Sequence, residues 1–241
     1  MRCGSYSTEW RRGRMKPVDP GRYTVVLEPA AVGDLLSFLV STIDMRSAEE
    51  GRSAFTKPGG GMRIGDAVAS PIVTLRSDPS SPLHPTSTFD EEGYPIHPTT
   101  WIDRGTLRSL TVSRYWAAKT KREPLAEPRS YVLSGGSAAS VDELVKGVDR
   151  GLLVTRFWYV RMLDPKQILC TGLTRDGVFL IEKGVVTRPV QNFRFNESPL
   201  AMLAHADAMT ASTVRSPPSA SLSVPAIRAQ EFNMASPSEA V

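Results

Sequence analysis

The sequence predicts an α+β fold, in which a few helices pack against a mostly antiparallel β-sheet. Three observations support this class: apolar residues recur at helical spacing in a few segments, β-branched runs fill others, and short glycine turns join several of those runs. A short turn joins only antiparallel strands, because parallel strands need a longer crossover. With 41% apolar and 22% charged residues, the 241-residue chain has the composition of a globular protein, which excludes disorder and collagen.

The expected strands come from β-branched and apolar runs. Residues 23–27 predict the first one. Glycine turns then predict two hairpins, at Arg104-Gly105 and at Lys183-Gly184. The first hairpin covers residues 99–103 and 107–112, and the second covers residues 178–182 and 185–190. One further long pair of strands covers residues 152–160 and 167–173.

Helices are expected where the apolar period is close to 3.6. Pro29 opens a stripe of Val and Leu that predicts a helix over residues 29–43. Ser140 and Glu143 have capping-box spacing and predict a helix from Ser140 to Arg150, with Gly151 as its stop. Two further helices are expected over residues 198–209, opened by Ser198-Pro199, and over residues 113–121, ending before Pro124.

The chain divides into a basic leader or linker, residues 1–20, and one domain, residues 21–241. The leader holds five basic and two acidic residues, so it carries most of the net charge of +4 and leaves the domain nearly neutral. A Ser/Pro-rich segment at about residues 211–225 is expected to cross the surface as a loop, and the apolar residues 224–232 are expected to dock after it.

The sequence also indicates the cellular compartment of the protein. No apolar run reaches the length of a membrane helix, and the start of the chain lacks the pattern of a secretory signal. Cys3 and Cys170 provide no disulfide framework. The predicted location is therefore the cytoplasm, with no membrane partner.

Motifs for chemistry are scarce. The sequence has no P-loop, no dinucleotide-binding glycine motif, no nucleophile elbow and no H-E-x-x-H helix. Gly59-Gly60-Gly61 is typical of a flexible loop. His84, His97 and His205 share no helical face, and a zinc site would have to be assembled from His84, His97 and the distant Cys170. The basic cluster at residues 119–129 is interleaved with glutamates, so nucleic acid is not the favoured partner.

Several collinear segments nevertheless resemble a known family. The longest reads GLLVTRFWYVRMLDPKQILCTGLTRDGVFLIEKGVVTRPVQNFRFNESPLAML, from Gly151 to Leu203. Others are YTVVLEP at 23–29, GRSAF at 51–55, ASPIVTL at 69–75, FDEEG at 89–93 and WIDRGTLRSL at 101–110. Together they resemble the C-terminal domain of the TldD/PmbA family, in which PmbA is also called TldE. The resemblance covers about residues 20–241.

This resemblance implies a heterodimeric, cytoplasmic metalloprotease that acts on unfolded peptides and matures peptide antibiotics, with a historical label as modulator of DNA gyrase. The TldD subunit of the family holds zinc through an H-E-x-x-x-H helix and a cysteine near the C-terminus. In this chain Ser37 and Thr42 occupy the positions of the two histidines, and Phe38 occupies that of the glutamate. The tail region expected to supply the cysteine contains none. Hydroxyls are poor zinc ligands, and a benzene ring cannot take a proton from water.

The sequence therefore predicts a TldE-like, non-catalytic subunit without zinc. The metal is expected only in a TldD-like partner, and this chain is expected to complete a chamber for unfolded peptide with that partner. Arg156, Phe157 and Trp158 are the candidate substrate-binding residues, although strand alternation places at least one of them in the core. Phe38 is expected to pack in the core.

Two alternatives stay open: a standalone hydrolase with an unrecognised site, and a nucleic-acid-associated protein that binds through its basic leader. Family members also carry an N-terminal half of comparable size, so this chain is expected to be a truncated form or to have a misassigned start.

Overall fold

The computed structural model describes residues 17–81, 86–216 and 222–239. The basic leader predicted over residues 1–20 lies almost wholly outside them. The helices are α2 (Pro29–Val40), α3 (Met45–Glu49), α4 (Arg114–Thr120), α5 (Val141–Lys146) and α6 (Pro199–Ala204). The strands are β1 (Gly21–Leu27), β2 (Thr74–Ser77), β3 (Thr99–Asp103), β4 (Thr106–Leu107), β5 (Tyr131–Ser134), β6 (Arg150–Asp164), β7 (Leu169–Glu182), β8 (Val185–Pro189), β9 (Phe193–Glu197), β10 (Ala206–Met209), β11 (Val214–Arg215), β12 (Leu222–Val224) and β13 (Ile227–Pro237).

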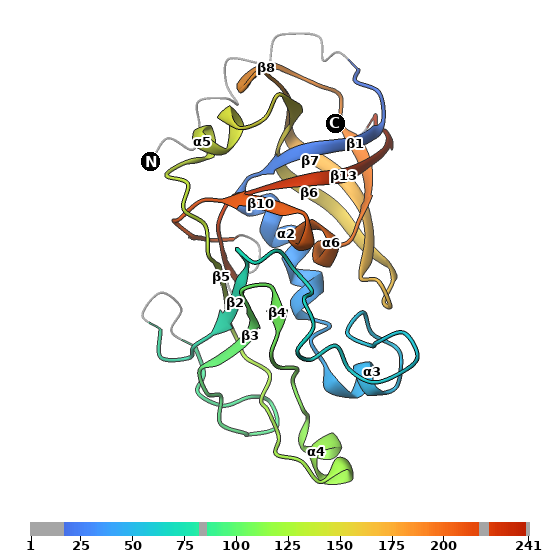
Figure 1. Ribbon diagram of the computed structural model, residues 1–241, viewed down its shortest axis with the longest axis vertical. Helices are drawn as coiled ribbons and strands as arrows, with labels where there is room; N and C mark the ends of the chain where they lie inside the picture. Colours follow the sequence, from blue (N-terminus) through green and yellow to red (C-terminus); the bar gives the residue numbers. More distant parts are fainter. Residues whose placement is uncertain (1–16, 82–85, 217–221, 240–241) are drawn as a thin grey trace.

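The first sheet closes on itself. Its order is β1-β6-β7-β9-β13-β10, and β1 pairs with β13 as well as with β6. Every pairing in it is antiparallel except β1 with β6. The closed sheet forms the upper part of Figure 1, where the long hairpin β6–β7 reaches the right-hand side of the molecule.

The second sheet has the order β11-β12-β5-β2-β3-β4 and lies below the first in Figure 1. It is antiparallel apart from the parallel pair β12–β5. The prediction of a mostly antiparallel α+β protein thus agrees with the two sheets and their few helices.

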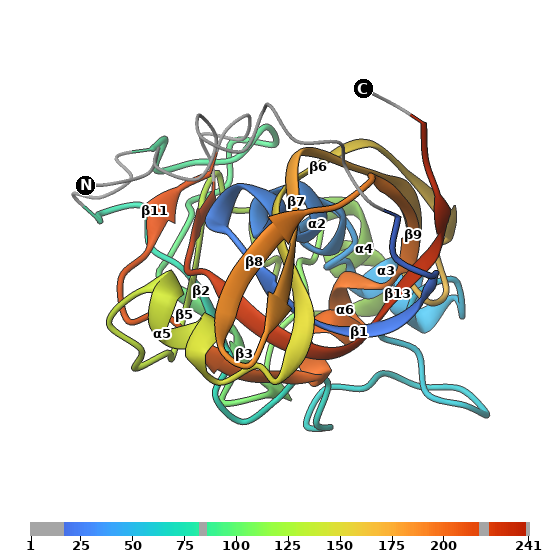
Figure 2. The same ribbon diagram turned by 90° about the horizontal axis from the view of Figure 1, so that it is seen from above.

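Helix α2 lies between the sheets and is surrounded by strands of the closed sheet in the view of Figure 2. Its apolar residues are buried on several sides, which explains why this segment is apolar nearly all round. Gly33 allows close approach: a Cβ there would lie 1.8 Å from Ser216 Oγ. The largest cluster of buried side chains runs through α2 and joins both sheets into one core.

The glycine turns form as predicted. Arg104 and Gly105 have φ of 46° and 80°, and Lys183 and Gly184 have φ of 50° and 75°. Two consecutive positive φ angles match the type I′ turn, whose twist suits a hairpin. Hairpins β3–β4 and β7–β8 are therefore confirmed, although β4 is only two residues long.

Helix ends differ from the prediction at three places. The helix expected over residues 29–43 ends at Val40, with Ser41 as its C-cap. The helix opened by Ser140 ends at Lys146, because Arg150 is already paired with Glu182 in the closed sheet. The helix opened by Ser198 ends at Ala204, since residues 206–209 pair with β13 as strand β10. In the latter two cases sheet pairing overrides a local helical pattern. The helix over residues 113–121 forms as α4, with Ser113 as its cap and Lys121 in the left-handed region at φ 56°.

The Ser/Pro-rich segment is not wholly a surface loop. Residues 214–215 and 222–224 form strands β11 and β12, while residues 217–221 lie outside the described part. Leu222 and Val224 are fully buried, and Ser216 is buried against α2. The segment therefore contributes to the core. The space beside Gly33 accommodates the small side chain of Ser216. No helix in the described residues is long and apolar enough to cross a membrane.

Candidate functional site

The positions onto which the resemblance aligns the family's zinc motif lie at the end of helix α2. The helix begins after Glu28, with Pro29 in its first turn, and its last residue is Val40. Ser37 and Phe38 lie in its final turn. Thr42 falls beyond the C-cap residue Ser41, in the turn that leads to α3.

The side chains at these positions serve the helix and the core. Ser37 Oγ donates to the Asp34 carbonyl at 2.9 Å, and Thr42 Oγ1 donates to the Leu39 carbonyl at 2.8 Å. Phe38 is half-buried and packs against the main core, as expected. Hydroxyls that bond back to the main chain and an apolar ring do not form a ligand set for zinc. The residues present do not fit the metal.

The other metal-ligating residue types do not come together either. Within the described ranges, no group of three His, Cys, Asp or Glu side chains is placed to hold a metal ion. His97 and His205 are exposed, Cys170 is fully buried, and His84 lies outside the described residues. Burial raises the pKa of the Cys170 thiol to about 11, so this sulfur stays protonated at neutral pH.

A buried carboxylate joins α2 to the long hairpin. Asp34, whose side chain is 8% exposed, accepts a hydrogen bond from the Phe157 main-chain N–H at 3.0 Å, and its Oδ2 lies 3.6 Å from Arg156 Nε. Burial raises the pKa of Asp34 to about 6, and the Phe157 N–H and the Arg156 charge oppose this rise without cancelling it. The sequence prediction missed Asp34, although a single acid inside an apolar helical stripe is an unusual pattern that could have drawn attention to it.

The three predicted substrate-binding residues divide between two environments. Phe157 is 2% exposed and packs in a cluster of three rings with Phe195 and Phe232. It is therefore the member of the trio that belongs to the core. Trp158 is 47% exposed, with the Arg175 guanidinium stacked 4.1 Å from its ring centroid. Arg156 is partly exposed beside Asp34.

A cavity of about 300 Å³ opens at the C-terminal end of α2, next to Ser41. Its wall carries carboxylates, but most of them have a structural role: Asp44 caps α3, Asp90 accepts from two main-chain N–H groups, and Glu91 pairs with Arg129. Further lining residues are Val40, Ile43, Glu92, Thr111, Val112, Ser113, Leu125 and Glu127.

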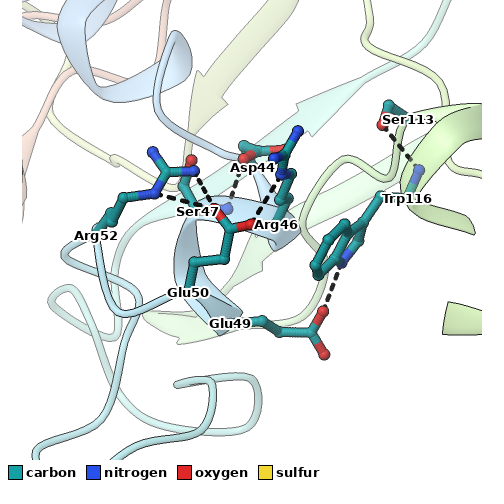
Figure 3. A network of polar contacts seen from close by, with 8 residues as sticks. All are labelled: Asp44, Arg46, Ser47, Glu49, Glu50, Arg52, Ser113 and Trp116. Atoms are coloured by element: carbon teal, nitrogen blue, oxygen red, sulfur yellow. Dashed lines mark hydrogen bonds and ion pairs between the residues drawn. The ribbon is translucent and has the colours of Figure 1, made fainter. Parts of the chain in front are cut away.

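Beyond this cavity, polar contacts fix α3 against α4. The Trp116 indole N–H donates to Glu49 at 2.6 Å, and Glu50 lies between Arg46 and Arg52 (Figure 3). Arg122 also pairs with Glu49 at 2.6 Å. The charged residues in these contacts therefore serve as structural pairs.

A comparison against protein families identifies the family of this chain. The model of the PmbA/TldA metallopeptidase C-terminal domain matches residues 20–236. Because the match covers most of the chain, the protein belongs to this family.

Solved structures show the same fold at low sequence identity. TldE from Thermococcus kodakarensis superposes with a TM-score of 0.79 at 20% identity, over 94% of this chain and 53% of that one. A protein described as a modulator of DNA gyrase from Bacteroides thetaiotaomicron gives 0.77 at 22% identity, over 91% and 48%. Another so described, from Thermotoga maritima, gives 0.78 at 19% identity, over 91% and 51%.

This chain thus spans about half the length of the solved structures that it resembles. A comparison with curated proteins finds no match.

Proposed function

We propose that this chain is a TldE-like, non-catalytic subunit of a cytoplasmic complex with a TldD-like metallopeptidase chain, and that it helps to hold unfolded peptide. One observation carries the proposal: the end of α2 offers Ser37, Phe38 and Thr42 where the family's catalytic subunit would hold zinc. Their hydroxyls bond back to the helix, and the ring packs in the core. The likeness to a structure described as TldE supports the same assignment.

The chemistry of these residues explains why the chain would depend on a partner. A metallopeptidase needs a metal to activate water and a carboxylate to take its proton. Neither can be supplied by two hydroxyls and a phenyl ring. The helix itself persists because its apolar residues, not the ligands, join the two sheets.

The test is co-expression of the full chain with a tagged TldD-like chain from the same genome. We expect the two to co-purify, with zinc and peptidase activity in the complex and neither in this chain alone. Stoichiometric zinc together with peptide cleavage by the isolated chain would support the standalone hydrolase instead. The absence of any association with the TldD-like chain would contradict the subunit assignment.

A further inference from the structure

The outer face of three neighbouring strands carries an unusual concentration of arginine. Phe157, Phe193 and Phe195 point into the core, so strand alternation places Arg156 and Trp158 of β6 and Arg194 of β9 on the opposite face. On β7 between them, Gly172 and Thr174 are buried, which turns Leu173 and Arg175 outward. We call these five outward residues the arginine face.

Register places two like charges directly opposite each other on this face. Arg156 pairs with Arg175 across β6 and β7, and Leu173 pairs with both Trp158 and Arg194. Like charges at opposed positions destabilise an antiparallel pair. Each of these arginines has one acidic neighbour, at a distance longer than that of a charge-assisted hydrogen bond: Asp34 lies 3.6 Å from Arg156 Nε, and Asp176 lies 3.5 Å from Arg175 Nε.

Exposed aromatic rings adjoin the arginines. Trp158 stacks with Arg175 at 4.1 Å, and Arg161 lies 4.7 Å from the centroid of the Tyr159 ring, which is 64% exposed. Stacking holds a guanidinium in place while its N–H groups stay free to donate, which suits carboxylates. Arg194 is also exposed, with one long hydrogen bond to Thr171. Charge complementarity therefore favours an anionic ligand with some apolar surface.

The shape of the site favours an extended chain. β1 pairs with β6 only as far as Val154, and further along the strand Asp34 accepts from the main-chain N–H of Phe157. In the part of the chain that the structure describes, no strand pairs with this edge of β6 from Thr155 to Asp164. An edge without a partner strand can accept main-chain hydrogen bonds from an extended peptide.

We propose that the arginine face, together with the neighbouring edge of β6, binds acidic segments of unfolded peptides. This deepens the proposed function and rests on it, since it names the class of peptide that the subunit would hold. Carboxylate side chains of the peptide pair with Arg156, Arg175 and Arg194, and its apolar side chains contact Trp158.

Binding is measured by fluorescence anisotropy with the full chain and labelled peptides. The probes are a peptide in which Glu alternates with Ser, its matched peptide with Lys in place of Glu, and a single-stranded oligonucleotide. We expect the acidic peptide to bind and the basic one not to. Arg175→Gln should weaken binding about tenfold, in line with a lost charge-assisted hydrogen bond, and Trp158→Ala about fivefold.

Matched controls come from the exposed arginine–aromatic pair of Arg46 on α3 and Tyr115 on α4, which are not part of the arginine face. Arg46→Gln and Tyr115→Ala should leave binding unchanged. Equal binding of the basic peptide, preferential binding of the oligonucleotide, or an equal loss in the control variants would overturn the proposal. Because these measurements use the isolated chain, failure to co-purify with a TldD-like chain would refute the subunit role separately.

Discussion

The two ends of the hairpin β6–β7 differ sharply in environment. At one end, Leu152, Leu153 and Val154 are buried and regularly paired. At the other, Trp158, Tyr159 and Leu163 are exposed while Val160 and Met162 are only partly buried, and the register shifts three times between Val154 and Asp164. Irregular pairing with exposed aromatic rings is characteristic of a surface that recognises a partner rather than one that stabilises the fold.

The difference indicates that one continuous strand serves two purposes. Its first half closes the sheet around α2, and its second half presents side chains to solvent. Phe157 and Trp158 mark the boundary, because they are neighbours in sequence and point to opposite faces.

The largest expected effect tests this boundary. Phe157→Ala removes a fully packed ring and should lower the free energy of unfolding by about 3 to 5 kcal/mol. Trp158→Ala should lower it by less than about 1 kcal/mol, mainly through the lost stack with Arg175. Urea unfolding followed by circular dichroism measures both. Similar losses for the two variants would show that the outer end of the hairpin is part of the core.

The Asp34 carboxyl, which ties α2 to the boundary, should make stability depend on pH. Its pKa of about 6 lies above the ordinary value of 3.8, so the folded protein binds this proton more tightly than the unfolded chain does. Its contribution is complete below about pH 4 and is lost as pH rises through 6. The lost stabilisation is about 2 to 3 kcal/mol.

Asp34→Asn should remove this fall, because an amide oxygen still accepts from Phe157 N–H but does not titrate. The measurement is the free energy of unfolding of both proteins between pH 4 and pH 7. Arg156 and Asp176 also act on this carboxyl, so the comparison is made at constant ionic strength. Parallel pH profiles would contradict the assignment of the proton to Asp34.

The close packing of Gly33 in α2 against Ser216 gives the next largest expected effect on stability. Gly33→Ala places a Cβ 1.8 Å from Ser216 Oγ and should cost about 1 to 3 kcal/mol, despite the better helix propensity of Ala. Gly21→Ala is the control, since its nearest neighbour would be 3.8 Å away. Adding Ser216→Gly to Gly33→Ala should recover part of the loss. Purely additive losses would mean that the two residues do not meet.

Local signals in the sequence predicted much of this fold. The turns at Arg104-Gly105 and Lys183-Gly184 and the helix starts at Ser140 and Ser198 depend on a few adjacent residues, and all of them form. The closure of the first sheet depends on β1 pairing with β13, two hundred or more positions along the chain. No local pattern encodes that pairing, which is also why the helices predicted to reach Arg150 and Met209 are shorter.

The candidate surface was predictable only in part for the same reason. Arg156 and Trp158 stand out within one strand, but Arg175 and Arg194 join them only through the register of β7 and β9. Phe157 was grouped with its neighbours because the face that is buried could not be assigned before the sheet was known. The buried Asp34 adjoins this surface only through a hydrogen bond to Phe157, between elements that the sequence does not place together.

The smallest expected effect on stability concerns the backbone of Tyr159, in the outer half of strand β6. Tyr159 has φ of 54°, in the left-handed region that Asn tolerates better than an aromatic residue does. Tyr159→Asn should therefore raise the free energy of unfolding by about 0.5 kcal/mol. Tyr115→Asn, at an equally exposed site inside helix α4, should instead lower it slightly because Asn is a weaker helix former. If Tyr159→Asn also lowered stability, the ring of Tyr159 with its stacked Arg161 would be contributing to the fold. The outer half of the hairpin could then not be treated as a surface free to bind.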